Sequence, residues 1–265
     1  MSTVRGSAAA LVAVALVALA GCDPAAGAPN APGPATGGSA PVQGAVTVLA
    51  AASLTEAFTE LGNRFEDGHP GTTVTFSFGS SATLATQVTQ GAPADVFAAA
   101  SPATMRTVTD AGAAEPPADF ATNTLELAVP PGNPGGVTGL ADLAKEDLRV
   151  ALCAEQVPCG AAAVRLLAAA GVDASPDTLE SDVKAVLQKV VADEVDAGLV
   201  YTTDVVAAGA GVEGIAVPEA ADVVNRYPVA VLRESRNPAT AQAFVDYLRS
   251  EPGQQVLRRA GFGAP

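Results

Sequence analysis

The chain has 265 residues but no tryptophan, and aromatic residues make up only 4% of it. Stacking on aromatic rings is therefore a poor basis for binding, which argues against a carbohydrate groove or an aromatic cage for cations. The chain also has a single histidine, His69, within the turn-like segment Asp67-Gly-His-Pro-Gly71. We interpret His69 as structural, so a serine nucleophile would lack the base that it requires.

Positive charge is scarce as well. The chain contains 14 lysines and arginines against 28 aspartates and glutamates, a net charge of −14, and no long cluster of basic residues. This balance argues against nucleic acid or an anionic membrane surface as a partner. The sequence has no nucleophile elbow, phosphate loop or paired metal-ligand motif, so we predict that the protein is not an enzyme. A secreted hydrolase is the alternative from a different functional class.

The first residues have the pattern of an export signal. Arg5 precedes an uncharged run from Ala8 to Ala20, which is too short to span a bilayer comfortably. The run ends in Leu19-Ala-Gly-Cys22, which resembles a bacterial lipobox. The resemblance implies removal of residues 1–21, a lipid on Cys22, and attachment to the outer face of the cytoplasmic membrane. The alternative is cleavage elsewhere, with Cys22 incidental. Residues 22–44 are rich in proline, glycine and alanine, which predicts a flexible tether.

Only two cysteines remain if Cys22 carries a lipid. Cys153 and Cys159 are then a pair in an exported chain, which indicates a disulfide. Such a bond would fix the shape of the turn at residues 154–158. Two free thiols are the alternative.

Several junctions predict a helix that begins directly after a strand or a turn. They lie at Ser53, at Ser81, at residues 158–160 and at Val183. At the first junction, Glu56 follows Ser53 by three residues, which is the pattern of a capping box. Unpaired backbone N–H groups and the helix dipole make such junctions attractive to anions. For a single such serine an ordinary helix cap is the simpler interpretation, so the functional interpretation rests on the recurrence of these junctions.

Strand and helix patterns alternate along residues 45–265, which favours the α/β class with parallel strands. Strands are predicted at 46–50, 72–78, 95–99, 124–130, 148–153, 197–201 and 227–232. In open α/β sheets, ligands bind at the carboxyl ends of strands. We therefore expect Ser53, Ser81 and the Tyr201 hydroxyl to lie near one site.

Seven short segments together resemble the molybdate-binding proteins of bacterial ABC importers, which have the type II periplasmic-binding-protein fold. The segments are AAASL at 50–54, FGSSATL at 78–84, GAPAD at 91–95, VPCG at 157–160, DV at 182–183, GLVY at 198–201 and YPVA at 227–230. They occur in the family's order and spacing. The resemblance covers essentially all of residues 45–262.

The resemblance implies a two-lobed α/β fold in which each lobe is a mostly parallel sheet flanked by helices. Lobe I would comprise residues 45–123 plus 227–265, and lobe II residues 124–226. A molybdate or tungstate oxyanion would lie between the lobes as the transported ligand, and no cofactor is implied. The partner would be an ABC permease in the membrane, and we expect a monomer.

The resemblance also implies a ligand set of neutral donors. Ser53 and Ser81 would each offer a hydroxyl and a backbone N–H, Cys159 and Val183 a backbone N–H, and Tyr201 its hydroxyl. Cys159 departs from the small residue, often alanine, that the family has at this position, but the implied contact is through the backbone. Molybdate, tungstate and sulfate are similar dianions, so sulfate, another oxyanion or chelated iron remain alternative ligands.

Overall fold

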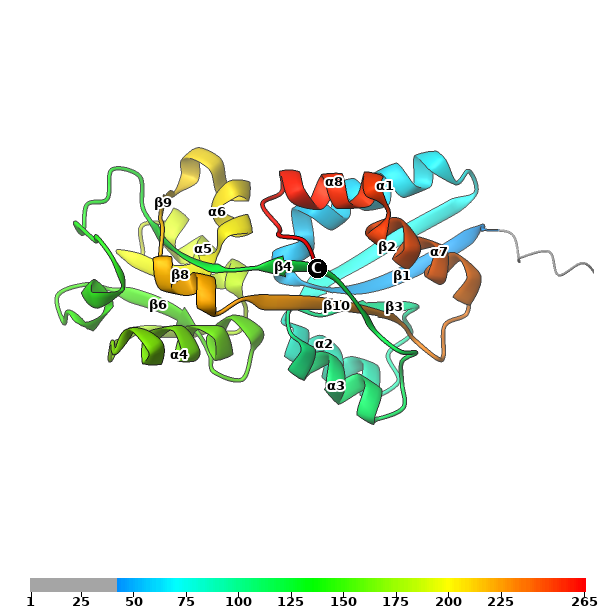
Figure 1. Ribbon diagram of the computed structural model, residues 1–265, viewed down its shortest axis with the longest axis horizontal. Helices are drawn as coiled ribbons and strands as arrows, with labels where there is room; N and C mark the ends of the chain where they lie inside the picture. Colours follow the sequence, from blue (N-terminus) through cyan, green and yellow to red (C-terminus); the bar gives the residue numbers. More distant parts are fainter. Residues whose placement is uncertain (1–41) are drawn as a thin grey trace, which may run out of the picture. The chain divides into compact units, whose positions relative to one another are not determined.

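The computed structural model describes residues 42–265. The predicted signal peptide, the lipid attachment at Cys22 and the tether as far as residue 41 lie outside the described residues. The described chain forms two five-stranded sheets, each flanked by helices (Figure 1). This arrangement confirms the predicted two-lobed α/β class.

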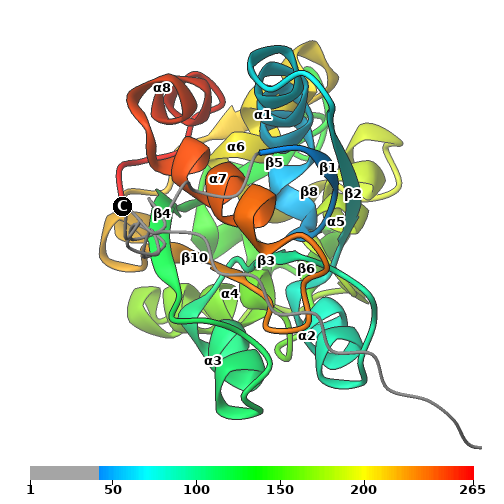
Figure 2. The ribbon, with the colours of Figure 1, turned by 90° about the vertical axis from the view of Figure 1, so that its right-hand side faces the viewer.

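The first sheet has the strand order β2–β1–β3–β10–β4. Its strands are β1 Gly44–Ala51, β2 Thr72–Gly79, β3 Val96–Ala98, β4 Ala118–Asn123 and β10 Asn225–Val231. The helices on this sheet are α1 Thr55–Gly68, α2 Ser81–Thr89, α3 Pro102–Asp110, α7 Pro238–Arg249 and α8 Glu251–Arg259. Figure 2 shows α1 and α7 over one face and α2 and α3 over the other, and each face has its own buried apolar cluster. We call this sheet with its helices the first lobe.

The second sheet has the strand order β7–β6–β8–β5–β9. Its strands are β5 Leu125–Val129, β6 Val150–Cys153, β7 Thr178–Glu180, β8 Ala197–Tyr201 and β9 Glu213–Ile215. The helices on this sheet are α4 Pro158–Ala170, α5 Val183–Val191 and α6 Thr202–Ala208. One apolar cluster of buried residues joins this sheet to its helices. We call this unit the second lobe.

In each sheet, one strand runs against the other four. The reversed strand is β10 in the first sheet and β5 in the second. The remaining strands are therefore mostly parallel in direction, as predicted, although the hydrogen-bonded pairings are mixed. Because parallel strands have their carboxyl ends at one edge of a sheet, the segments after β1 and β6 and the end of β8 are available to one site.

The chain passes between the two sheets twice. On the first passage, β4 is followed by β5 after the single residue Thr124. On the return, the 3₁₀ turn η4 (Pro218–Asp222) leads into β10. The two passages lie side by side, because Asn123 at the end of β4 pairs with Asn225 at the start of β10.

Several predicted helix starts are confirmed and two are wrong. Ser101 and Asp182 cap α3 and α5 by accepting hydrogen bonds from the N–H groups of Thr104 and Ala185. Ser53 is no cap, because a 3₁₀ turn, η1 (Ala52–Leu54), intervenes before α1 and its hydroxyl bonds elsewhere.

Thr203 and Asp204 do not precede α6 as predicted but lie within its first turn. Tyr201 occupies the cap position of α6, and its N–H donates to the Asp204 carboxylate. Strands β4, β7 and β9 were not predicted. β7 and β9 have only three residues each, whereas β4 has six. All three lie at the edge of their sheet and pair with a single neighbouring strand, so their local pattern is weak.

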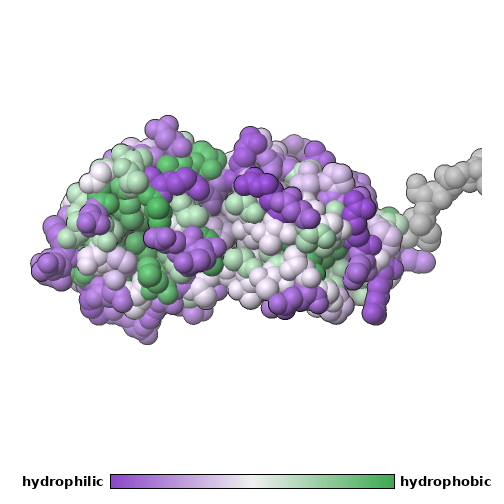
Figure 3. Space-filling model, turned by 90° about the horizontal axis from the view of Figure 1, so that it is seen from below, coloured by the Kyte–Doolittle hydropathy of each residue, from purple (hydrophilic) through white to green (hydrophobic). Residues whose placement is uncertain are grey.

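Exposed large apolar side chains occur only in the second lobe among residues 42–265. They are Val164, Leu179, Val191, Val206 and Val224. Figure 3 shows apolar colour more strongly on the half of the molecule that carries α4. Within the same residues, no helix has both the length and the apolar character needed to cross a membrane.

Candidate functional site

All five residues predicted to bind the ligand line one cavity between the lobes. The cavity, together with the open solvent at its mouth, has about 230 Å³ of empty space. Ser53 and Ser81 reach it from the first lobe, and Cys159, Val183 and Tyr201 reach it from the second. Segments that lie far apart in the sequence thus meet here, which is the convergence that the carboxyl ends of the strands led us to expect.

Three helices begin at the cavity. Ser81 is the first residue of α2, Val183 is the first residue of α5, and Cys159 lies in the first turn of α4. The first N–H groups of a helix have no partner within the helix, and the helix dipole is positive at this end. Ser53 contributes differently, from η1, where its hydroxyl lies 3.0 Å from the Tyr227 hydroxyl.

Two cavity hydroxyls accept hydrogen bonds from the protein and keep a proton to donate. The Ser81 Oγ accepts from the Ala100 N–H at 3.1 Å. The Tyr201 hydroxyl accepts from the Asn225 amide at 2.6 Å. A hydroxyl can accept and donate at once, so each of these groups is oriented by its donor and can still bind an anion.

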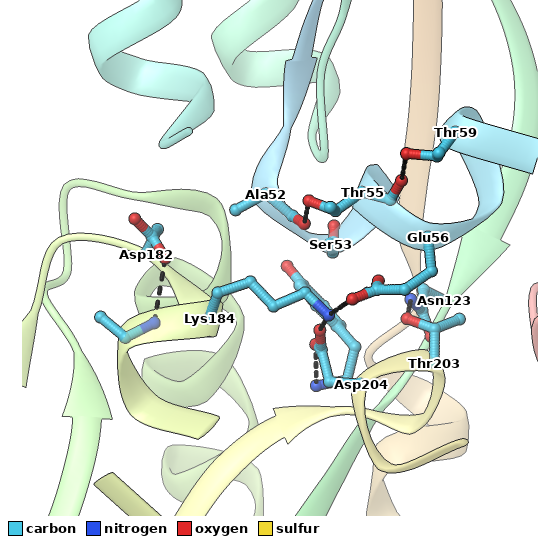
Figure 4. Close-up of polar contacts among 12 residues, drawn as sticks. Ala52, Ser53, Thr55, Glu56, Thr59, Asn123, Asp182, Lys184, Thr203 and Asp204 are labelled. Carbon is cyan, nitrogen blue, oxygen red and sulfur yellow. Dashed lines mark hydrogen bonds and ion pairs between the residues drawn. The ribbon is translucent and has the colours of Figure 1, made fainter. Parts of the chain in front are cut away.

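The cavity is built from neutral donors. No lysine or arginine is among the residues that line it in the described part of the chain. Burial raises the pKa of Tyr201 well above its ordinary value, with further contributions from Tyr227 and Asp204, so its hydroxyl stays protonated. Asp182 is the one carboxylate in the lining, and it is directed onto the N-terminus of α5 by its bond to the Ala185 N–H (Figure 4).

Sequence reasoning overlooked Ser80 as a site residue. Ser80 lines the cavity and is only 7% exposed, and its hydroxyl has no hydrogen-bond partner among the described residues. It occupies the cap position of α2 without capping the helix. The available signal was its place beside Ser81 at a predicted helix start. Tyr227 begins the YPVA segment of the family resemblance, but nothing in the sequence indicated its contact with Ser53. Asn225 had no sequence signal, because its bond to Tyr201 depends on a long-range contact.

A disulfide joins Cys153, at the end of β6, to Cys159 in α4, which confirms the predicted pair. The loop between them approaches the helix closely. A Cβ atom on Gly160 would lie 1.9 Å from the Ala154 carbonyl oxygen, so a larger residue does not fit there. The disulfide and Gly160 together hold the start of α4 against the end of β6, beside the cavity.

His69 is remote from this lining. It follows the last residue of α1, its Nδ1 lies 2.9 Å from the Phe65 carbonyl oxygen, and its ring stacks on the Phe65 ring. In the described residues, no group of three or more histidine, cysteine, aspartate or glutamate side chains is arranged to hold a metal ion.

Comparison with known proteins identifies the family to which this chain belongs. The family profile described as bacterial extracellular solute-binding protein matches residues 46–263. The chain belongs to this family. Among relatives of this solute-binding protein, the molybdate-binding protein ModA of Mycobacterium tuberculosis strain H37Rv is 44% identical over 235 residues, which cover 88% of this chain and 90% of the relative. The predicted resemblance to molybdate-binding proteins is confirmed.

Two solved structures share the fold of the solute-binding protein. The periplasmic molybdate-binding protein of Azotobacter vinelandii has a TM-score of 0.73 and 21% identity, covering 83% of this chain and 99% of that one. The sulfate-binding protein SubI of Mycobacterium tuberculosis H37Rv has a TM-score of 0.72 and 19% identity, covering 83% of this chain and 86% of that one. At these identities the likeness shows the fold alone, and the fold does not select the ligand.

Proposed function

We propose that this solute-binding protein captures molybdate, and also tungstate, between its lobes and delivers it to an ABC permease in the membrane. The observation that carries the proposal is the lining of the cavity, where hydroxyl and N–H donors from both lobes converge without a lysine or arginine. The 44% identity to ModA of Mycobacterium tuberculosis supports molybdate as the ligand. Membership of the solute-binding family supports a role in transport rather than catalysis.

In this proposal, the oxyanion accepts hydrogen bonds from five positions. Ser53 and Ser81 donate from their hydroxyls and backbones, Cys159 and Val183 donate from their backbones, and Tyr201 donates from its hydroxyl. Residues 45–123 plus 227–265 form one lobe and residues 124–226 the other. The anion binds to one lobe, the other lobe closes over it, and the closed form docks on the permease.

Neutral donors also provide selectivity. The site aims donors at every ligand oxygen, so it favours a fully deprotonated tetrahedral dianion. A protonated phosphate would carry a hydrogen without an acceptor, and a buried unpaired group costs about 1–3 kcal/mol. Molybdate and tungstate differ from sulfate mainly in size, so the dimensions of the cavity must separate them. Sulfate is the second candidate ligand, because the sulfate-binding protein SubI has the same fold.

Thermal unfolding of the purified protein with molybdate, tungstate, sulfate, phosphate or no addition tests the ligand. At about 1,000 times its Kd, the bound ligand stabilises the folded state by about 4 kcal/mol. For a protein of this size, the melting temperature then rises by roughly 8–16 °C. A rise with molybdate and tungstate alone is the expected result. A rise with sulfate alone would support binding of an oxyanion between the lobes but would make sulfate the ligand. No rise with any oxyanion would refute the proposal.

We further propose that the protein is exported and anchored to the outer face of the cytoplasmic membrane through a lipid on Cys22. The tether would hold the protein near its permease and raise its effective concentration there. Replacing Cys22 with serine is expected to release the protein from the membrane fraction. A Cys22→Ser protein that stays fully membrane-bound would disprove the lipid anchor.

A further inference from the structure

Lys184 joins the two lobes by an ion pair. Its Nζ lies 2.8 Å from each carboxylate oxygen of Glu56, which is on α1 in the first lobe, whereas Lys184 itself is on α5 in the second lobe (Figure 4). Across residues 42–265, every other ion pair joins two residues of one sheet and its helices. This includes Arg226 and Asp119, which lie on the neighbouring strands β10 and β4 of the first sheet. The Lys184–Glu56 pair is therefore the one ionic contact between the described parts of the lobes.

The other partner of Lys184 is a fully buried carboxylate. Asp204 is 0% exposed, and its Oδ1 lies 3.1 Å from the Lys184 Nζ. The second oxygen, Oδ2, accepts a hydrogen bond from the Tyr201 N–H at 3.1 Å. A buried charge is unfavourable unless it is paired, so Asp204 holds Lys184 in a defined position beneath the cleft.

These three charged residues are each close in sequence to a cavity residue. Glu56 follows Ser53 by three residues, Lys184 follows Val183 directly, and Asp204 follows Tyr201 by three residues. We call Glu56, Lys184 and Asp204 the charge relay, a name that here means only two ion pairs sharing Lys184 and implies no transfer of a proton. It ties together three of the six chain segments that line the cavity, although none of its members lines the cavity itself.

We propose that the charge relay is a positioning and closure device: Asp204 sets the places of Tyr201 and Lys184 within the second lobe, and Lys184 holds Glu56 of the first lobe when the cleft is closed. The proposal rests on the proposed function for its ligand. The side chain of Lys184 is only 19% exposed, so its attraction to Glu56 is screened less by water and salt than a fully exposed pair would be. The relay acts on how long the cleft stays closed.

Glu56→Gln tests the proposal, because the Glu56 side chain is 52% exposed and its replacement does not endanger folding. The relay predicts that molybdate dissociates about two- to fivefold faster from this variant, a size typical of a single ion pair. A long-range charge effect predicts the opposite, because removal of a negative charge should retain the anion better. Raising the salt concentration should speed dissociation from the wild type and have less effect on the variant.

Glu60→Gln is the matched control. Glu60 is on the same helix, and its ion pairs with Arg64 and Arg259 stay within the first lobe. The control removes the same charge without touching the contact between lobes, so molybdate should not dissociate faster from it. Dissociation from Glu56→Gln that is unchanged or slower than from the wild type would overturn the proposal.

A measurement without ligand keeps this test separate from that of the proposed function. Asn63 on α1 and Gln188 on α5 are exposed and belong to different lobes, so spin labels on cysteines placed there report the distance between the lobes. The labelled protein would carry Cys22→Ser, with Cys153 and Cys159 oxidised. Glu56→Gln should shift the distance distribution of the ligand-free protein toward longer distances. If molybdate does not bind the wild type, the proposed function fails, and an unchanged distribution would overturn the relay independently.

Discussion

The hydroxyls of Ser53 and Tyr227 lie 3.0 Å apart, and both residues are buried. Ser53 follows β1 and lines the cavity, whereas Tyr227 is in β10, the strand by which the chain returns to the first lobe. Tyr227 also lies 3.5 Å from the Asn123 amide at the end of β4. The orientation of a cavity hydroxyl is thereby tied to both segments that connect the lobes.

Tyr227→Phe should weaken the binding of molybdate by roughly tenfold, the equivalent of about one buried hydrogen bond. Without its partner, the Ser53 hydroxyl can rotate away from the orientation in which it donates to the anion. Isothermal titration calorimetry would measure the loss. Tyr247→Phe is the control, because no hydrogen bond of the Tyr247 hydroxyl occurs among the described residues and the residue does not line the cavity. Equal affinities in the two variants would contradict the prediction.

Ser80→Ala should reduce the affinity for the oxyanion about five- to a hundredfold while leaving the ligand-free protein as stable as the wild type or more so. The reason is that its buried hydroxyl has no partner among the described residues, so removing it sacrifices no internal bond. The bound ligand would supply the missing acceptor. Calorimetric titration and thermal unfolding measure the two effects. Ser77→Ala on the exposed side of β2 should change neither, and an unaltered affinity in Ser80→Ala would show that its hydroxyl does not contact the ligand.

Replacing Cys153 and Cys159 together with serine should lower the free energy of unfolding by about 2 kcal/mol, because the disulfide closes a short loop. The melting temperature should fall by roughly 4–8 °C. We also expect weaker molybdate binding, since the start of α4 would have to be ordered when the ligand binds. Unchanged affinity in the double variant would exclude this role of the disulfide and leave it a purely stabilising one.

Asp204 should make the stability of the protein depend on pH. Burial raises the pKa of Asp204 to about 6, while Lys184 and the Tyr201 N–H oppose the rise and the charge of Glu56 adds to it. Burial alone would lower the pKa of Lys184, but its ion pairs with Asp204 and Glu56 raise the pKa by more than burial lowers it. Lys184 therefore stays charged over the pH range in which Asp204 titrates.

The folded state binds the Asp204 proton more tightly than the unfolded state does. Its contribution to stability is therefore present below about pH 4 and is lost as the pH rises through about 6. Asp204→Asn, which resembles the protonated acid, should lack this loss, which is on the order of 2–3 kcal/mol. Melting temperatures of both proteins between pH 4 and 7.5 measure it. Two curves that stay parallel over this range would show that Asp204 does not titrate there.

The sequence by itself determined the class of the fold and the positions where helices meet the cavity. These features depend on residues that are close along the chain: apolar strand runs, helix-starting residues such as Ser101 and Asp182, and glycine stops such as Gly171 after α4. Local signals of this kind also placed Ser81, Cys159 and Val183 near helix N-termini. They misassigned Ser53 as a helix cap, because a hydroxyl that can cap locally can also bond to a distant partner.

Only the tertiary structure decided which of these junctions face one another and what holds them. Ser53 and Tyr227 are 174 positions apart in the sequence, and Glu56 and Lys184 are 128 positions apart. No local pattern marks such partners, because the free energy of each contact arises only after the two sheets have brought the segments together. The cavity, the unpartnered hydroxyl of Ser80 and the charge relay are therefore properties of the packed lobes. Before the chain folds, nothing in the local sequence distinguishes the residues that form these features from other residues of the same types.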